Sequence, residues 1–308
     1  MHLTTDYSTK ILHLNPDYEG EAIAVLIASN HNQGNRESVL YIHGYIDYFF
    51  QAHLGKAFNN HGIDFYALDL RKHGRALLPH QHPNYCKSLT EYYEEISMAL
   101  REISCNSRAV YLMGHSTGGL LASNYMNEGE ARNLVSKLIL NAPFLDFIQS
   151  KLTQSVSLVA AKAVAGLSDY AKLEGMISPA YVKSIHQDFH GEWEFNLDWK
   201  PVRGFPTYFK WIVAIAKAQQ KLEHSAIPVP VLLLHSSGSK KLNRYTEEAK
   251  NHDIILDVED MKRIGPSLGK NVTLVQIDHA MHDVFLSAQP VRKKAFEELF
   301  NWLGAGAK

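Results

Sequence analysis

The sequence predicts an α/β protein with a mainly parallel central sheet, helices on both faces and an inserted helical cap. Three observations lead to this class. Short β-branched and aliphatic runs alternate with longer amphipathic runs over the first half of the chain. The short runs are almost continuously apolar, which is typical of parallel strands buried on both faces. The alternation stops after Pro143 and resumes at Pro228, which indicates an insertion between them.

The predicted elements follow from this alternation. Seven apolar runs are expected to form strands, at residues 22–28, 38–43, 63–70, 109–114, 137–141, 229–235 and 271–277. Four amphipathic runs are expected to form helices, at residues 49–60, 89–104, 118–128 and 290–303. The pair His61-Gly62 ends the first helix as a C-cap. The early part of the chain is therefore a repeated strand-helix unit.

The domain prediction rests on the interruption. We expect a core of residues 1–143 and 228–308 and an inserted cap, or lid, of residues 144–227. The cap contains a small-residue apolar helix at 157–167 and a cluster of aromatic side chains, namely Trp193, Phe195, Trp199, Phe205, Tyr208, Phe209 and Trp211. Packing of the cap onto the core is the simpler interpretation of this cluster. The alternative is an apolar ceiling over a substrate cleft, and both can hold for different members.

Composition and charge exclude several classes of function. The 31 Lys and Arg nearly cancel the 32 Asp and Glu, and no long run of like charge occurs. A nucleic-acid groove or an anionic-membrane patch is therefore disfavoured. No apolar run reaches the roughly 18 residues of a membrane span, and the N-terminus lacks the pattern of a signal peptide. We expect a cytoplasmic protein in which Cys86 and Cys105 are free thiols.

The most specific motif is G-x-S-x-G at Gly114-His115-Ser116-Thr117-Gly118. An apolar strand precedes it and a helix-forming run follows it, as a nucleophile elbow requires. On such a turn the serine stands at a helix N-terminus, whose positive end stabilises an alkoxide-like transition state. The sequence therefore predicts Ser116 as the nucleophile of a hydrolase.

An activated serine needs a general base. In α/β folds with a nucleophile elbow, this base follows a late strand. The segment after the last expected strand offers His279 and His282. We predict His282, because it follows the strand by a full loop and precedes an apolar run, whereas His279 lies close to the strand end. A metal site built on this His-x-x-His pair is the alternative, but no third ligand has a supporting spacing. No metal or other cofactor is predicted.

The acid that orients the base is expected in the loop after the strand at 229–235. Asp253 precedes an apolar triplet that can anchor the loop, and it is our prediction. Asp257 is the first alternative, although it is also a natural N-cap for the helix that follows. Asp260 and Asp146 are the remaining candidates.

The oxyanion hole should combine two backbone N–H groups. One belongs to Thr117, the residue after the nucleophile, and the other to Tyr45, because the strand before it ends in His43-Gly44 and glycine lets the loop approach the reacting carbonyl. We expect a structural role for His43, which would hold this loop through a side-chain hydrogen bond.

These motifs together resemble a known family. The chain is similar to the monoacylglycerol lipase and lysophospholipase-like branch of the α/β hydrolases, often grouped with serine aminopeptidase-like hydrolases, on the strength of His43-Gly44, Asp69-x-Arg71-x-x-Gly74, Gly114-His115-Ser116-Thr117-Gly118-Gly119 and His282-Asp283. The resemblance runs from about residue 22 to residue 303 and is weakest in the cap. It implies the α/β-hydrolase fold, with an acid in the pattern Asp-x-apolar-apolar, which fits Asp253 better than Asp257. It further implies His282 as the base and the N–H groups of Tyr45 and Thr117 as the oxyanion hole.

One departure from the family pattern concerns the acid. The family approaches it through Gly-x-x-Asp, whereas here Gly238 is followed by a longer charged stretch, residues 240–252, before Asp253. Thr117 stands where the family commonly has methionine or glutamine, which changes little because the hole uses the backbone.

The expected function is that of a carboxylesterase, a serine hydrolase of small-molecule esters with an apolar acyl group. Within hydrolases the alternatives are a lysophospholipase or monoacylglycerol lipase and, less favoured, an aminopeptidase. The aminopeptidase would use acidic cap residues such as Glu192, Glu194 and Asp198 to recognise a free N-terminus. Outside enzymes, the alternative is a binding module that kept the fold without turnover.

Overall fold

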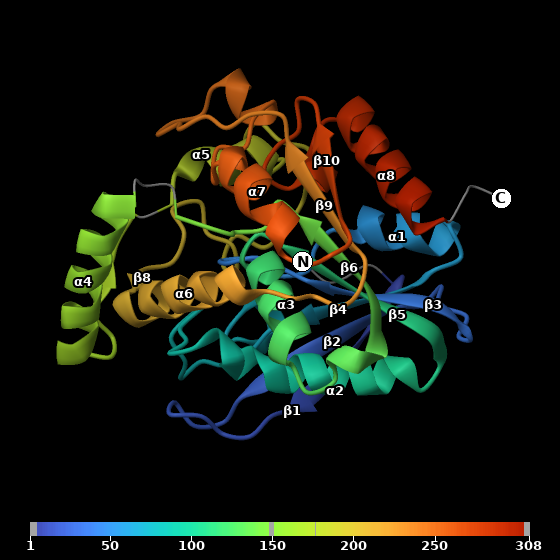
Figure 1. Ribbon diagram of the computed structural model, residues 1–308, viewed down its shortest axis with the longest axis horizontal. Helices are drawn as coiled ribbons and strands as arrows, with labels where there is room; N and C mark the ends of the chain where they lie inside the picture. The colour runs from blue at the N-terminus through green and yellow to red at the C-terminus, as the bar shows by residue number, and fades with distance from the viewer. Residues whose placement is uncertain (1–4, 148–150, 176, 305–308) are drawn as a thin grey trace.

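An eight-stranded sheet forms the centre of the computed structural model, which describes residues 5–147, 151–175 and 177–304 (Figure 1). The spatial order is β1-β2-β4-β3-β5-β6-β9-β10. The strands are β1 (Tyr7–His13), β2 (Ile23–Ser29), β3 (Arg36–Ile42), β4 (Asp64–Asp69), β5 (Ser107–His115), β6 (Val135–Asn141), β9 (Val231–Ser236) and β10 (Val272–Ile277). All seven predicted strands are present.

The sheet is parallel from β4 to β10, and only β1 and β2 run antiparallel to their neighbours. Strand β1 was not predicted. It lies at the edge of the sheet, and of its seven residues only Leu12 is buried. An edge strand with one covered position has no continuous apolar run, so its sequence lacks the signal by which the buried strands are found.

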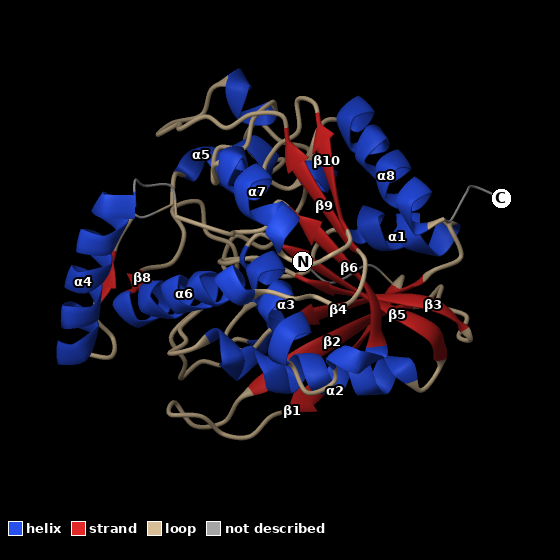
Figure 2. Ribbon diagram, viewed as in Figure 1, coloured by secondary structure: helices blue, strands red, loops and turns tan. Residues whose placement is uncertain are grey.

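Helices cover both faces of this sheet, as Figure 2 shows. One face carries α1 (Ala52–Asn60) and α8 (Gln289–Leu303), whose buried side chains form one apolar cluster with the strands. The other face carries α2 (Tyr93–Ser104), α3 (Thr117–Glu128), α6 (Phe209–Lys221) and α7 (Val258–Ile264). The mainly parallel sheet between two helical layers is the predicted arrangement.

Two helix starts in the core differ from prediction by three or four residues, and both have local causes. In the inserted segment, the helix predicted at 157–167 is longer and begins at Lys151. Helix α1 begins at Ala52 because Phe49 is fully buried in the preceding loop, where its N–H donates to the Asp69 carboxylate. Helix α2 begins at Tyr93, after a short 3₁₀ turn that Ser88 caps through a capping box. The predicted end of α1 is correct, since the chain turns at Gly62 with φ +74°.

The chain between β6 and β9 forms α4 (Lys151–Leu167), α5 (Pro179–Ile185), α6 and a two-stranded ribbon of β7 (Lys172–Leu173) and β8 (Thr207–Tyr208). Helices α4 and α6 lie side by side at one edge of the molecule (Figure 1). Helix α5 contributes to a separate apolar cluster that includes Ile254 and Met281, from the loops after β9 and β10. This part of the chain therefore contacts the carboxyl-end loops of the sheet.

The aromatic cluster at 193–211 divides between the two roles considered for it. Trp193 stacks on His53 with ring centroids 4.1 Å apart, and Phe195 packs on Phe50 at 4.7 Å. These rings therefore attach the segment to the core. Phe209 and Trp211 instead line the large cavity that contains Ser116.

Both cysteines are free thiols, Cys86 buried and Cys105 exposed. In the described ranges, no helix is long and apolar enough to cross a membrane.

The packing predicts where the fold is most sensitive. Phe58 of α1 is fully buried between Phe65 and Phe300, with ring centroids 5.8 and 5.3 Å away. Phe58→Ala should lower the free energy of unfolding by about 3–5 kcal/mol, because the cavity it leaves cannot collapse fully. The same change at Phe189, which is 40% exposed, is the control and should cost no more than about 1 kcal/mol. Equal losses in chemical denaturation would contradict this packing.

Candidate functional site

Ser116 lies on a sharp turn between β5 and α3. Its backbone has φ 54° and ψ −119°, a conformation that non-glycine residues rarely adopt and that costs free energy. The turn is held on both sides: the Ser116 N–H donates to the Asn141 carbonyl at 3.0 Å, and the Ser116 carbonyl accepts from the Phe144 N–H at 3.0 Å. The loop after β6 thus fixes the strained turn.

The glycines two residues before and after Ser116 make this turn possible. A Cβ on Gly118 would lie 2.3 Å from the His43 carbonyl oxygen, and a Cβ on Gly114 would lie 2.4 Å from the Gly118 carbonyl oxygen. Both distances are far inside van der Waals contact, so the backbones of β3, β5 and α3 meet here only because these side chains are absent. This is the geometry that the G-x-S-x-G motif predicted.

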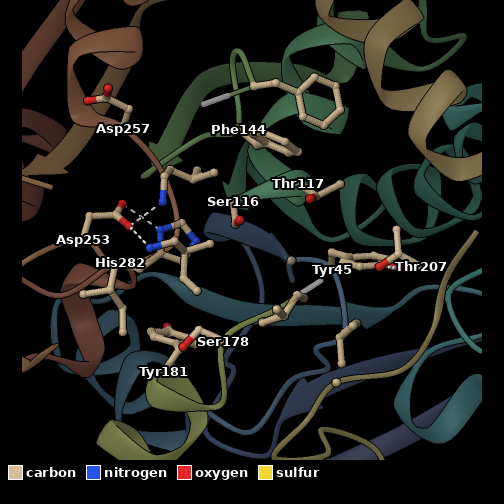
Figure 3. Close-up of a pocket in the computed structure, with 18 of the residues that line it drawn as sticks. Tyr45, Ser116, Thr117, Phe144, Ser178, Tyr181, Thr207, Asp253, Asp257 and His282 are labelled. Carbon is tan, nitrogen blue, oxygen red and sulfur yellow. Dashed lines mark hydrogen bonds and ion pairs between the residues drawn. The ribbon is translucent and has the colours of Figure 1, made fainter. Parts of the chain in front are cut away.

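His282 and Asp253 meet in the same region. The His282 Nδ1 lies 2.8 Å from the Asp253 Oδ2, and both side chains are buried. The ionised carboxylate only accepts, so Nδ1 carries the proton and donates. In Figure 3 the His282 ring lies between the Asp253 carboxylate and the Ser116 side chain. The structure therefore brings together the three residues predicted as nucleophile, base and acid.

The second oxygen of Asp253 is fixed by the backbone. Its Oδ1 accepts from the N–H groups of Ile255 at 2.9 Å and Leu256 at 2.8 Å. The charged stretch before it is closed at its base, because the Asp253 N–H donates to the Gly238 carbonyl and the Lys240 N–H donates to the Asp253 carbonyl. The extra residues therefore form a loop whose two ends are hydrogen-bonded to each other. The loop does not displace the Asp253 carboxylate from His282.

The other candidate acids are engaged elsewhere. Asp257 is the N-cap of α7, where its side chain accepts from the Glu259 N–H at 3.1 Å. Asp260 and Asp146 both pair with Arg263, at 2.6 and 2.7 Å. Asp257 lies at the wall of the cavity, but none of the three has a hydrogen bond to His282 among the described residues.

His279 does not point into this site. It is exposed, lies in a left-handed turn with φ 59° directly after β10, and its N–H donates to the Ser237 hydroxyl at 3.2 Å. Within the described part of the chain, no group of three or more His, Cys, Asp and Glu is arranged to hold a metal ion.

The loop of His282 is anchored through its neighbour Asp283, whose Oδ1 accepts from the Asn141 amide at 2.7 Å.

The N–H groups of Tyr45 and Thr117 are the two predicted oxyanion donors. Thr117 is the first residue of α3, and Tyr45 follows β3, the strand next to β5. Neither N–H donates a hydrogen bond to any residue that the structure describes. Both residues line the cavity together with Ser116. Figure 3 shows them on one side of Ser116, with His282 on the other.

His43 holds the loop of Tyr45, as the sequence indicated. Its Nε2 accepts from the Leu70 N–H at 3.1 Å, so its Nδ1 is the protonated nitrogen and donates to the Gly44 carbonyl at 2.8 Å. The Gly44 carbonyl and the Tyr45 N–H belong to one planar peptide, so this bond also orients the N–H. Burial lowers the pKa of His43, which favours the neutral ring that this pattern requires.

A cavity of about 1390 Å³ opens over these groups. One wall is apolar and comes from the loop after β6 and from α4 and α6, with Phe144, Phe147, Leu158, Val164, Trp211 and Ile212. Trp211 stacks on the Tyr45 ring with centroids 3.9 Å apart. The residues predicted to react therefore lie at the base of a largely apolar space.

A buried ion pair that the sequence did not predict lines the same cavity. The Lys200 Nζ lies 2.8 Å from the Asp47 Oδ1, and both side chains are buried. Lys200 comes from the segment between β6 and β9, and Asp47 from the loop of Tyr45. Burial acts to raise the pKa of Asp47, but the surrounding basic groups, with Lys200 foremost, together outweigh burial, so that pKa lies below its usual value. No local pattern joins residues so far apart in sequence.

Two further groups near His282 were also missed. The His115 ring lies 4.8 Å from the His282 ring, and burial lowers the pKa of His115, which keeps it neutral beside the base. The Tyr181 ring of α5 meets the His282 ring edge-on at 5.7 Å, and burial raises the pKa of its hydroxyl well above the usual value. His282, the predicted base, therefore has two neutral rings beside it.

This arrangement of sheet, strained serine turn and late histidine defines the α/β-hydrolase fold, which confirms the predicted fold. A model of the serine aminopeptidase S33 family, a family of hydrolases, matches residues 33–288. The chain therefore belongs to this family.

Solved structures agree on the fold. The chain is similar to a soluble variant of monoglyceride lipase from Saccharomyces cerevisiae, with a TM-score of 0.67 at 18% identity over 96% of each chain. It is also similar to the monoacylglycerol lipase of Paleococcus ferrophilus, with a TM-score of 0.64 at 18% identity over 98% of this chain and all of the other. A third similar structure is that of a thermostable carboxyl esterase from Bacillus coagulans in complex with glycerol. Its TM-score is 0.65 at 13% identity, over 96% of this chain and 98% of the other. A search of curated protein sequences finds no significant match.

The Asp47–Lys200 pair leads to a prediction on stability. Lys200→Met should lower the free energy of unfolding at neutral pH by about 3–5 kcal/mol, because it leaves the Asp47 carboxylate buried without a partner. The double variant Asp47→Asn, Lys200→Met is the control and should recover most of the loss, since no charge is then buried. Chemical denaturation measures both.

The pH dependence of this loss has a definite sign. Since the pKa of Asp47 is depressed in the folded protein, the pair stabilises above the unfolded value of about 3.9 and loses its effect as the pH falls through the folded value. The difference between wild type and Lys200→Met should therefore shrink as the pH is lowered below about 4, because a protonated Asp47 leaves no unpaired charge in the variant. An undiminished difference in acid would show that packing of the lysine stem, not its charge, is responsible.

Proposed function

We propose that the protein is a serine carboxylic-ester hydrolase with Ser116 as nucleophile, His282 as base and Asp253 as acid. The observation that carries this proposal is the hydrogen bond of 2.8 Å between His282 and a fully buried Asp253, in one cavity with a serine on a strained turn. A backbone strained in this way costs stability, and such strain is typical of functional sites. A binding module would not need it.

The proposed reaction proceeds through an acyl-enzyme. The Ser116 oxygen attacks the ester carbonyl and passes its proton to the free nitrogen of His282, while Asp253 stabilises the imidazolium. The N–H groups of Tyr45 and Thr117 donate to the oxyanion of the tetrahedral intermediate. His282 then protonates the departing alcohol, and a water molecule activated by the same ring releases the acid.

The proposed substrate has an apolar acyl group. Residues 144–227 would act as a cap over the core of residues 1–143 and 228–308, and its side chains Leu158, Val164 and Trp211 line the cavity. Burial of apolar acyl carbons against these side chains would supply binding free energy at roughly 0.8 kcal/mol for each methylene.

A second candidate, hydrolysis of long-chain glycerol esters by a monoacylglycerol lipase or lysophospholipase, is favoured by the size of the cavity. Its volume of about 1390 Å³ exceeds the roughly 300–1,000 Å³ of common small-molecule sites. An aminopeptidase is disfavoured, because Glu192, Glu194 and Asp198 are exposed and none of them lines the cavity.

A substrate panel tests the proposal. We expect hydrolysis of p-nitrophenyl esters, with kcat/KM rising from acetate toward longer chains, and no cleavage of an aminoacyl anilide. Faster turnover of a monoacylglycerol than of any simple ester would select the second candidate.

Ser116→Ala should remove on the order of 10⁴-fold or more of the rate, because no other group forms the acyl-enzyme. Activity above a few per cent in this variant would overturn the proposal.

The acid assignment has a test of its own. Asp253→Asn should lower kcat by about 10³- to 10⁴-fold with little change in melting temperature, since an amide favours the wrong tautomer of His282. Asp257→Asn is the matched control and should be nearly silent, because asparagine caps a helix about as well as aspartate. A collapse of kcat in Asp257→Asn, with Asp253→Asn active, would transfer the role to Asp257.

A further inference from the structure

Three residues with left-handed backbones form a hydrogen-bonded chain that ends at the loop of Tyr45. Ile46, Asn84 and Lys72 have φ values of 50°, 60° and 64°. The Ile46 N–H donates to the Asn84 Oδ1 at 3.0 Å, and the Asn84 N–H donates to the Lys72 carbonyl at 3.0 Å. All three residues are buried. For a β-branched residue such as Ile46 this backbone is a clear outlier, so something must hold it.

The far end of the chain is firmly anchored. The Lys72 side chain is fully buried, and its Nζ lies 2.8 Å from the Asp17 carboxylate and 2.7 Å from the Glu19 carboxylate. The same ammonium lies 4.3 Å from the centre of the Tyr18 ring. The turn formed by the N-terminal segment thus fixes Lys72, and through its carbonyl it fixes the backbone of Asn84.

The near end acts on the proposed oxyanion donor. Tyr45 lies between two planar peptides, and a side chain from outside holds each of them by a hydrogen bond. His43 holds the Gly44–Tyr45 peptide through the Gly44 carbonyl, and Asn84 holds the Tyr45–Ile46 peptide through the Ile46 N–H. With both planes fixed, the φ and ψ angles of Tyr45 are fixed as well, and so is the direction of its N–H.

We propose that Asn84 is a positioning residue for ester hydrolysis, which holds the Tyr45 N–H in the direction of the oxyanion. This inference rests on the proposed function. Asn84 acts only through its oxygen, because its Nδ2 is buried and has no hydrogen-bond partner among the described residues. The amide group therefore supplies an acceptor to Ile46 and donates nothing in return.

Two substitutions separate positioning from folding. Asn84→Gly removes the acceptor and tolerates φ 60°, whereas alanine would add backbone strain. We expect its kcat on a p-nitrophenyl ester to fall about 10-fold or more with KM nearly unchanged. This loss is smaller than the roughly 10²- to 10³-fold loss of kcat that follows removal of a whole oxyanion donor, because the Tyr45 N–H is misaligned but still present. Affinity for a trifluoromethyl ketone, which forms an oxyanion on the serine, should fall by the same factor. Asn84→Asp keeps an acceptor oxygen and should restore kcat even if its melting temperature is lower.

Gln81→Ala is the control for stability. Gln81 is buried in the same segment, and among the residues that the structure describes its side chain bonds only to the Leu78 N–H and the Glu21 carbonyl. It should lower the melting temperature and leave kcat unchanged. Full kcat in Asn84→Gly, or equal losses of kcat in Asn84→Gly and Asn84→Asp, would overturn the inference while leaving the proposed function intact. A wild-type protein that hydrolyses no ester would overturn both.

Discussion

The positive φ of Ser116 is the constraint on which the rest of the site depends. It forces β5 to turn into α3 within one residue, and the turn is possible only where Gly114 and Gly118 leave room for the backbone of β3. Because β5 lies between β3 and β6, the loops at the carboxyl ends of these neighbours converge on Ser116. One of them presents the N–H of Tyr45, and the other holds the turn through Asn141 and Phe144.

The groups around this turn are polar, buried and paired. Asp253 is satisfied by His282 and by two backbone donors, and Asp47 is satisfied by Lys200. An unpaired charge at either position would lower the free energy of unfolding by about 3–5 kcal/mol. The whole free energy of unfolding of a typical domain is only about 5–15 kcal/mol. The Asp47–Lys200 pair also ties the segment between β6 and β9 to the loop of Tyr45. The segment proposed to bind the acyl group and the loop of the proposed oxyanion donor are therefore physically linked.

Most of the sheet could be predicted because its strands are buried on both faces and leave a continuous apolar run. The edge strand β1 could not, since only Leu12 is covered. The serine turn, His282 and Asp253 were brought together as predicted because motif and chain order constrain them, whereas their catalytic roles stay predictions. The contacts of Lys200 with Asp47 and of Asn84 with Ile46 join positions 153 and 38 residues apart. Such pairs have no sequence periodicity, and only the folded chain reveals them.

We propose that Ser116, His282 and the N–H groups of Tyr45 and Thr117 form one reacting unit. The most direct test is a crystal structure of the protein treated with a trifluoromethyl ketone. We expect a covalent bond to the Ser116 oxygen, with the resulting oxyanion about 2.7–3.1 Å from both backbone nitrogens. The His282 ring should keep its bond to Asp253. An adduct on another residue, or an oxyanion turned away from Tyr45 and Thr117, would show that these groups do not react as one unit.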